Sequence, residues 1–172
     1  MAQPLRRVVT GHDDQGRSRI LFDGPCPNVH VRATEPLVAM TELWSTRETP
    51  ARNDGDEDAA AGPLSLPPPP RGSVFRIVEL PPDRLRNWAN LAAIDPAHAK
   101  ESGHRHPGFH KTRTLDYIIV LQGEVWALMD EGETLLRTGD VLIQRGTHHA
   151  WSNRSDSPVL LAGVLIDAEP LP

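Results

Sequence analysis

The sequence has a single cysteine, few aromatic residues and no long apolar run. Cys26 has no partner for an internal disulfide, which fits a cytoplasmic location, and its neighbouring prolines favour a loop or core thiol over a nucleophile. No stretch of about 18 apolar residues is present, so we expect no transmembrane helix and no membrane partner. The amino-terminal residues include arginines but lack the apolar core of a secretory signal.

Positive charge is also scarce, because 18 Lys and Arg face 23 Asp and Glu, for a formal net charge of −5. Basic stripes with interleaved aromatic residues are absent, so nucleic acid is not an expected partner. A chain of 172 residues is long enough for one domain with a sizeable core. The hydrophobic fraction is only 38%, with 17 prolines and 13 glycines, which predicts a folded core that carries long irregular segments.

What the sequence does have is a run of short apolar segments between residues 106 and 153, separated by glycines. Antiparallel hairpins place glycine where φ must be positive, so this spacing predicts strands joined by tight turns. Short strands at such intervals indicate an all-β sandwich or barrel. The strands that we predict in this half of the chain cover residues 114–121, 124–130, 133–137, 141–144 and 158–166. The last is nearly all apolar, which suits a strand covered by the barrel core on one face and by a partner subunit on the other.

The first part of the chain predicts further strands and one helix. Residues 83–94 repeat apolar side chains at helical spacing, with Asp83 available as the N-cap. The predicted strands are an amino-terminal hairpin, a short edge strand and two longer strands, at residues 6–10 with 18–22, 29–31, 38–44 and 74–80.

Between residues 45 and 72 the strand pattern stops. This segment contains an acidic cluster and a four-proline run that favours extended polyproline II. We predict a mobile loop, with a lid or a proline-motif ligand as the alternatives. The predicted organisation is therefore amino-terminal strands packing on or extending the barrel (1–44), a mobile loop (45–72) and the barrel itself (73–172).

Two polar clusters fall on separate predicted strands and can meet inside the barrel. Residues two apart share a face of a strand, so His110, Thr112 and Asp116 point together. His149 and Trp151 share a face on the later strand, and His148 points the other way. Two imidazoles and one carboxylate suit Fe(II), with Mn, Ni, Co or Zn as further choices, and leave positions open for water or substrate.

Other side chains extend this candidate site. The hydroxyl of Thr112 would orient a bound water, and His106 would supply a third nitrogen if the incoming loop folds back. With eight histidines in the chain, clustered loop histidines also have a plain alternative as solvated side chains. From spacing alone the two interpretations stay equally open.

The same residues resemble the two motifs of the cupin superfamily. Its first motif runs G-x5-H-x-H-x3,4-E-x6-G, and this sequence matches from His110 onwards, with Asp116 at the glutamate position and six residues between it and Gly123. Its second motif runs G-x5-P-x-G-x2-H-x3-N, and Gly146, His149 and Asn153 keep its last part intact. This match covers about the last 65 residues. Phrases such as VAMTELW and QRGTHHAWSN are similar to those of small single-domain cupins, which extends the resemblance over most of the chain.

The resemblance implies an antiparallel jelly-roll barrel, to which this chain would add amino-terminal strands and one short helix. It also implies a divalent metal held by His110, Asp116 and His149. The sequence departs from the family at Thr112, which replaces the second histidine, and at Gln144-Arg145, which replaces the proline region. The ligand set is therefore one histidine short.

A metal held by two neutral histidines and one aspartate keeps positive charge, which favours a small anionic or enolisable oxygen ligand. Four residues complete the predicted substrate site, two as cations near the barrel mouth and two on the face of His149: Arg113, Arg145, Trp151 and Asn153.

Three functions follow from these expectations. The first is a metal-dependent enzyme, whether decarboxylase, isomerase, hydrolase or dioxygenase. The second is a non-enzymatic module whose degenerate metal site holds a small ligand. The third is an oligomerisation scaffold. A homodimer is expected in each case, because cupins commonly pair through a barrel face.

Overall fold

The computed structural model describes residues 4–32, 35–88 and 105–169, and these residues form an almost entirely β structure. The predicted amino-terminal hairpin, edge strand and long strands are confirmed. The strands are β1 (Arg6–His12), β2 (Ser18–Pro25), β3 (Val29–Arg32), β4 (Glu35–Thr46), β5 (Ser73–Leu80), β6 (Thr114–Gln122), β7 (Glu124–Met129), β8 (Glu133–Arg137), β9 (Val141–Arg145), β10 (His149–Ser152) and β11 (Val159–Asp167).

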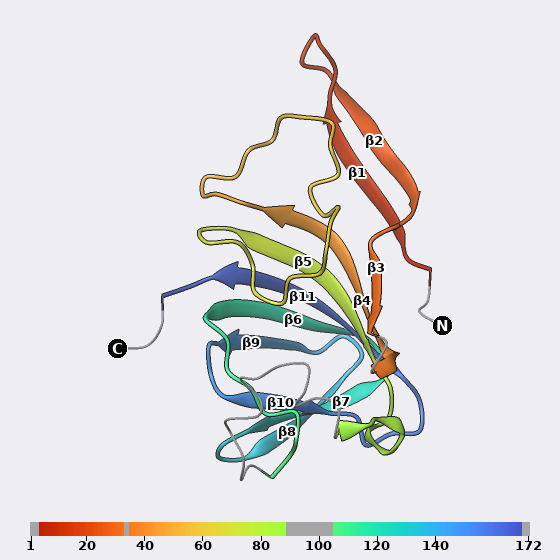
Figure 1. The fold of residues 1–172 in the computed structure, drawn as a ribbon, viewed down its shortest axis with the longest axis vertical. Helices are drawn as coiled ribbons and strands as arrows, with labels where there is room; N and C mark the ends of the chain where they lie inside the picture. Colours follow the sequence, from red (N-terminus) through yellow and green to blue (C-terminus); the bar gives the residue numbers. More distant parts are fainter. Residues whose placement is uncertain (1–3, 33–34, 89–104, 170–172) are drawn as a thin grey trace.

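Two sheets build the barrel (Figure 1). The larger has the order β3-β4-β5-β11-β6-β9 and the smaller the order β10-β7-β8, with antiparallel pairing throughout. A single apolar cluster fills the space between them, because alternate residues of both sheets point inward. Its buried members are Val38, Leu80, Ile118, Val120, Val125, Ala127, Leu136, Val159 and Leu161.

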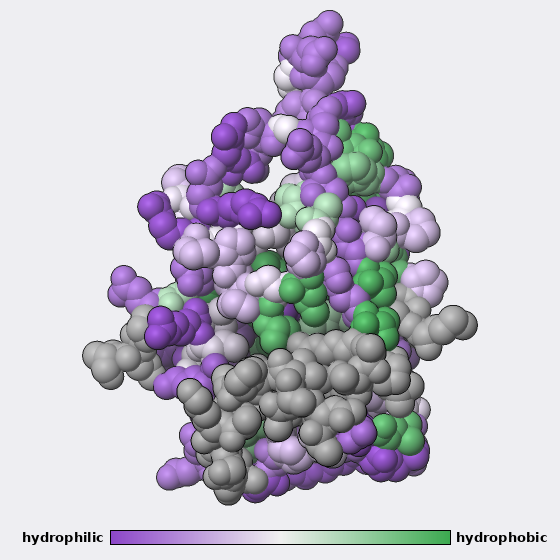
Figure 2. All heavy atoms as spheres, in the orientation of Figure 1, coloured by the Kyte–Doolittle hydropathy of each residue, from purple (hydrophilic) through white to green (hydrophobic). Residues whose placement is uncertain are grey.

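The amino-terminal strands enlarge this barrel. Strands β3 and β4 extend the larger sheet, and the β1–β2 hairpin is a separate two-stranded ribbon that projects from the body (Figure 1). In the same orientation, Figure 2 shows the tip of the hairpin and most of the segment between β4 and β5 as hydrophilic.

A second apolar cluster lies on the outer face of the larger sheet. Ile77, Leu160 and Ala162 are buried there, and Leu5, just before β1, packs against them. We expected a partner subunit to cover the outer face of β11. In this part of the strand, the chain's own amino terminus covers it.

The predicted α-helix at residues 83–94 is wrong over the residues that the structure describes. Asp83–Leu85 form one 3-10 turn (η1), Arg86 is already extended, with φ −86° and ψ 143°, and of the described residues that follow, Trp88 is again in 3-10 conformation. Asp83 is not an N-cap, because its carboxylate accepts hydrogen bonds from the Ser152 hydroxyl at 2.6 Å and the Asn153 main-chain N–H at 3.2 Å. The remainder of the predicted helix, residues 89–94, lies outside the described residues. In the part of the chain that is described, no helix has the length and hydropathy needed to span a bilayer.

The segment between β4 and β5 is attached to the barrel by two arginines. Arg7 of β1 donates to both carboxylate oxygens of Asp58, at 2.8 and 2.6 Å. Arg76 of β5 donates to the main-chain oxygens of Ser65 and Leu66, at 2.7 and 3.2 Å. These contacts hold the segment against β1 and β5, and its mobility stays a prediction.

The Arg7–Asp58 pair predicts an acid-dependent part of the stability. The hydrogen bonds from Arg7 lower the pKa of Asp58 from 3.8 to about 2. A carboxylate with a lowered folded pKa stabilises the fold above its unfolded pKa, and this stability is lost as pH falls from about 4 through about 2. Asp58→Asn is therefore expected to lower the free energy of unfolding by about 1–2 kcal/mol at pH 7, measured by urea denaturation, and to flatten its change between pH 4 and pH 2.

The matched control is Asp54→Asn, because Asp54 pairs with Arg52 where both side chains are more than half exposed. Such exposed pairs contribute little, so this variant should unfold like the unmodified protein. Equal losses in the two variants would contradict the assignment.

Candidate metal and ligand site in the barrel

His110 and His149 are brought together by the main chain. An isolated bridge joins them, in which each main-chain N–H donates to the other residue's carbonyl, at 2.9 and 3.0 Å. Phe109 anchors the incoming segment, because its ring is only 3% exposed and packs with Leu128 and Ala150 on the outer side of the smaller sheet. The next side chain then points inward, so His110 faces the interior.

The two imidazoles are in contact, with ring centroids 4.4 Å apart and planes inclined by 50°. Nδ1 of His110 lies 2.9 Å from the carbonyl oxygen of Gly108, and Nδ1 of His149 lies 2.9 Å from that of Thr147. A carbonyl only accepts, so each Nδ1 must carry a proton, and in the neutral imidazole the lone pair is then on Nε2. Histidines that bind metals are commonly held in this way, with the second ring nitrogen donating to a carbonyl.

Asp116 lies in the barrel wall on β6 and is 5% exposed. Its Oδ1 is buried and has no hydrogen-bond partner. Burial raises the pKa of Asp116, although the Thr114 hydroxyl and the positive charge of Arg76 act in the opposite direction. The carboxyl is thus desolvated without being fully compensated, which costs stability unless something else meets it.

These residues fit a metal in donor chemistry, because two oriented imidazoles and one uncompensated carboxyl face the same interior. Among residues 4–32, 35–88 and 105–169, however, no three side chains of His, Cys, Asp or Glu are placed together so that they could hold an ion. The structure brings His110 and His149 into contact and leaves the complete three-ligand set as a prediction.

The weaker metal candidates have other contacts. Nε2 of His106 lies 3.3 Å from the Asp83 carboxylate, and its Nδ1 accepts from the Gly108 N–H at 3.1 Å. The hydroxyl of Thr112 accepts from that of Thr114 at 2.7 Å. His106 therefore holds the segment that leads to His110, and Thr112 is bonded along its own segment.

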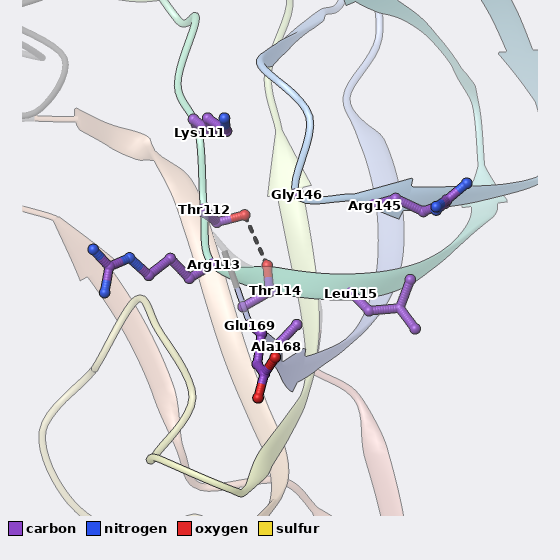
Figure 3. A pocket seen from close by; sticks show the side chains of 9 residues that line it. All are labelled: Lys111, Thr112, Arg113, Thr114, Leu115, Arg145, Gly146, Ala168 and Glu169. Atoms are coloured by element: carbon purple, nitrogen blue, oxygen red, sulfur yellow. Dashed lines mark hydrogen bonds between the residues drawn. The ribbon is translucent and has the colours of Figure 1, made fainter. Parts of the chain in front are cut away.

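The two predicted substrate arginines line a pocket of about 450 Å³ where β6 begins and β9 ends (Figure 3). Arg113 and Arg145 are exposed, and Figure 3 shows their side chains pointing away from each other. Lys111 adds a third cation to this pocket, and Glu169 is the acidic group in its lining. The pocket carries positive charge at the barrel end, but its cations do not converge on one point.

The predicted residues of the later strand divide into two roles. Trp151 packs against the barrel core and meets the His149 ring edge-on, with centroids 5.7 Å apart. Asn153 is buried, and its amide binds the loop around it: Nδ2 donates to the carbonyls of Leu80 and Ser157, and Oδ1 accepts from Ser155. Trp151 thus borders the imidazole pair, whereas Asn153 fastens the end of β10 to the end of β5.

Comparison with known proteins agrees with this barrel fold. No family model matches the chain. The cupin-domain-containing oxidoreductase virC of Hypocrea virens is 30% identical over 179 residues, which covers 99% of this chain and 81% of that protein. The chain belongs to the cupin superfamily.

Two further relatives are similar over nearly the whole of this cupin. Phomopsin biosynthesis cluster protein C′ of Diaporthe leptostromiformis is 31% identical over 173 residues, covering 96% of this chain and 79% of that protein. The cupin-domain-containing oxidoreductase srdB of Neurospora crassa is 39% identical over 171 residues, covering 96% of this chain and 74% of that protein.

The barrel interior of this cupin holds a buried ion pair that the sequence reasoning missed. Arg76 of β5 and Glu42 of β4 are register partners, both under 9% exposed, with Nε and Oε1 3.0 Å apart. The Nε–Oε1 contact falls outside hydrogen-bond geometry, and the hydrogen bond of the pair runs from Nη2 of Arg76 to Oε2 of Glu42 at 3.4 Å. Burial raises the pKa of Glu42, and the charges of Arg76 and His30 act against that rise. The sequence did contain a signal for this pair. Glu42 and Arg76 each lie two residues from an inward-facing apolar residue, Met40 and Val78, on predicted strands.

Gln144 was also missed as a candidate. It lies on β9 directly opposite Asp116 of β6 and is 2% exposed. Its Oε1 is buried without a hydrogen-bond partner. A glutamine in an otherwise apolar strand, VLIQ, was the signal that could have identified it.

Proposed function

We propose that this cupin is a metal-dependent oxidoreductase that acts on a small oxygen-rich molecule with a carbonyl, carboxylate or enolisable group. The observation that carries the proposal is the contact of two imidazoles whose Nδ1 atoms are both tied to main-chain carbonyls. In the neutral rings this arrangement places the lone pairs on the Nε2 atoms, and neutral imidazole nitrogen is a common ligand of divalent transition metals. The relative virC is named an oxidoreductase, which favours redox chemistry over the other reaction types.

The residues would divide the work as follows. His110 and His149 would hold the metal, with Asp116 as the carboxylate of the predicted set. The bound metal would act as a Lewis acid toward the substrate oxygen or, as iron, exchange electrons. Trp151 would bound the ligand space beside His149, and Arg113 with Arg145 would attract an anionic substrate to the barrel end. A cytoplasmic location remains a prediction.

Metal binding tests this proposal directly. The full chain is loaded separately with Fe(II), Mn, Ni, Co and Zn under anaerobic conditions, desalted, and measured for metal content by mass spectrometry. We expect about one ion per chain for at least one metal, and at least about tenfold weaker binding in His149→Ala and His110→Ala. His12→Ala is the matched control, because His12 is exposed in the β1–β2 hairpin, and it should bind like the unmodified chain. Absence of stoichiometric binding for every metal would overturn the proposal.

The second candidate function is a non-enzymatic module that binds a small ligand. The observation that favours it is Thr112, which stands at the second histidine position of the family and bonds to Thr114. Thermal-shift screening separates the two functions. Ligand stabilisation that is unaffected by chelator supports the module, and stabilisation that requires metal supports the enzyme.

We also propose that two copies pair through the outer face of β6 and β9. This face carries five large apolar side chains that are 41% to 58% exposed: Tyr117, Ile119, Leu121, Val141 and Ile143. Exposed apolar side chains gathered on neighbouring strands are typical of protein interfaces. Asp140 lies directly before β9 and Arg145 is its last residue, so a two-fold axis through the face would bring Arg145 of one copy toward Asp140 of the other.

Sedimentation velocity at micromolar concentration tests this pairing. The unmodified chain is expected to sediment as a dimer, and Ile143→Lys as a monomer, because a charge in the apolar face would have to be buried. Gln15→Lys, in the exposed turn of the β1–β2 hairpin, is the control and should remain dimeric. A monomeric unmodified chain would contradict the pairing.

A further inference from the structure

Gln144 lies on β9 between Asp116 in the barrel wall and the turn that leads to His149. Its side chain points inward from β9, because Leu142, two residues earlier, packs against the barrel core. Its register partner is Asp116, the carboxylate of the predicted metal set. Directly after β9 comes the turn that leads to His149 at the start of β10.

The amide nitrogen of Gln144 binds the middle of this turn. Nε2 donates to the Thr147 main-chain oxygen at 3.3 Å and also contacts the Thr147 hydroxyl. The same main-chain oxygen accepts from Nδ1 of His149 at 2.9 Å. A carbonyl oxygen has two lone pairs, so it can accept from the glutamine and the imidazole together. Gln144 therefore fixes the atom that sets the orientation of the His149 ring.

The turn itself is packed so that this carbonyl has little freedom. Gly146 has φ 57°, a left-handed conformation that favours glycine, and a Cβ there would lie 3.2 Å from the Thr112 main-chain oxygen. The turn thus lies close to the segment that leads from His110 into β6. A change at Gln144 would be passed to His149 through a short, closely packed path.

Stability alone does not explain a glutamine at this position. Its Oε1 is buried and unpaired, and such an acceptor carries a desolvation cost that an apolar side chain avoids. Replacing Gln144 would not leave a partner group buried and unpaired, since Thr147 is exposed. An apolar side chain of similar length would therefore be tolerated by the fold.

We propose that Gln144 is a positioning residue for His149, which acts through the Thr147 carbonyl to hold the imidazole with its proton on Nδ1 and its lone pair on Nε2. In this sequence glutamine occupies the region in which the general cupin motif has proline. The inference rests on the proposed function only in assuming that His149 binds a metal. Its orienting role can be tested in the metal-free protein.

The test replaces Gln144 in the full chain and measures the protonation of each imidazole nitrogen in His110 and His149 separately. In the chelator-treated protein, ¹⁵N spectra of the imidazoles report which ring nitrogen carries the proton. In Gln144→Met, His149 is expected to lose its single Nδ1–H form and show a mixture of tautomers. His110 is the internal control, because its Nδ1 binds the Gly108 carbonyl, and it should keep its form. The melting temperature should stay within about 3 °C of the unmodified chain.

Cobalt(II) provides the second readout, through its visible absorption and its affinity. Loss of a group that orients a metal-binding histidine typically costs about 10–100-fold in metal affinity, and we expect a loss in this range for Gln144→Met. Thr147→Val removes the hydroxyl but keeps the carbonyl, so it is the matched variant and should retain both the His149 spectrum and the affinity. Gln144→Leu serves as a second apolar replacement if the methionine variant does not fold.

The outcomes distinguish the two proposals. An unchanged His149 spectrum in a folded Gln144 variant overturns the positioning role, as does a variant that loses stability while His149 keeps its tautomer. If the unmodified chain binds no cobalt, the metal-dependent function loses support. The metal-free ¹⁵N spectra still decide the role of Gln144 in that case.

Discussion

The site depends on the pair of main-chain hydrogen bonds between His110 and His149. His110 lies before β6 in the larger sheet, and His149 begins β10 in the smaller sheet, so this bridge joins the two sheets where both histidines face inward. Main-chain pairing fixes the spacing of the two Cα atoms to within the narrow limits of a ladder. Local carbonyls then fix each ring, and the buried Phe109 ring keeps the incoming segment in place. A side-chain contact alone would not define both position and tautomer.

Around this bridge the barrel interior is unusually polar for a protein core. The Arg76–Glu42 pair, Asp116 and Gln144 are all buried, and the last two each have an oxygen without a partner. Removing polar groups from water costs free energy, whereas burying apolar residues does not. The attraction within a buried ion pair often does not offset the desolvation cost of its two charges. The apolar cluster between the two sheets supplies stability, so these polar groups can serve binding. A few polar groups within a largely apolar interior are typical of a ligand site.

The strands could be predicted because glycine spacing and side-chain alternation are local signals, and the same alternation placed His110 and His149 inward and His148 outward. Helical spacing at residues 83–94 was misleading, since Asp83 is drawn to Ser152 and Asn153 by tertiary contacts that spacing cannot reveal. The register of β4 could not be predicted from the sequence either. A bulge between Glu42 and Trp44 pairs Glu42 with Arg76 and Trp44 with Phe75. Glu42 and Trp44 therefore do not share a face, although strict alternation had placed them on the same one. The buried ion pair and the Gln144 contact depend on such registers, and for that reason they emerged only in three dimensions.

The central claim is that both imidazoles carry their protons on Nδ1 and present Nε2 to the barrel interior. Long-range ¹H–¹⁵N correlation spectra of the unmodified, metal-free chain at neutral pH measure this directly, because protonated and unprotonated ring nitrogens resonate far apart. We predict that His110 and His149 both show a protonated Nδ1 and an unprotonated Nε2, and that both Nε2 signals move or broaden when metal is added. Protonated Nε2 atoms in both rings, with signals unaffected by metal, would contradict the claim.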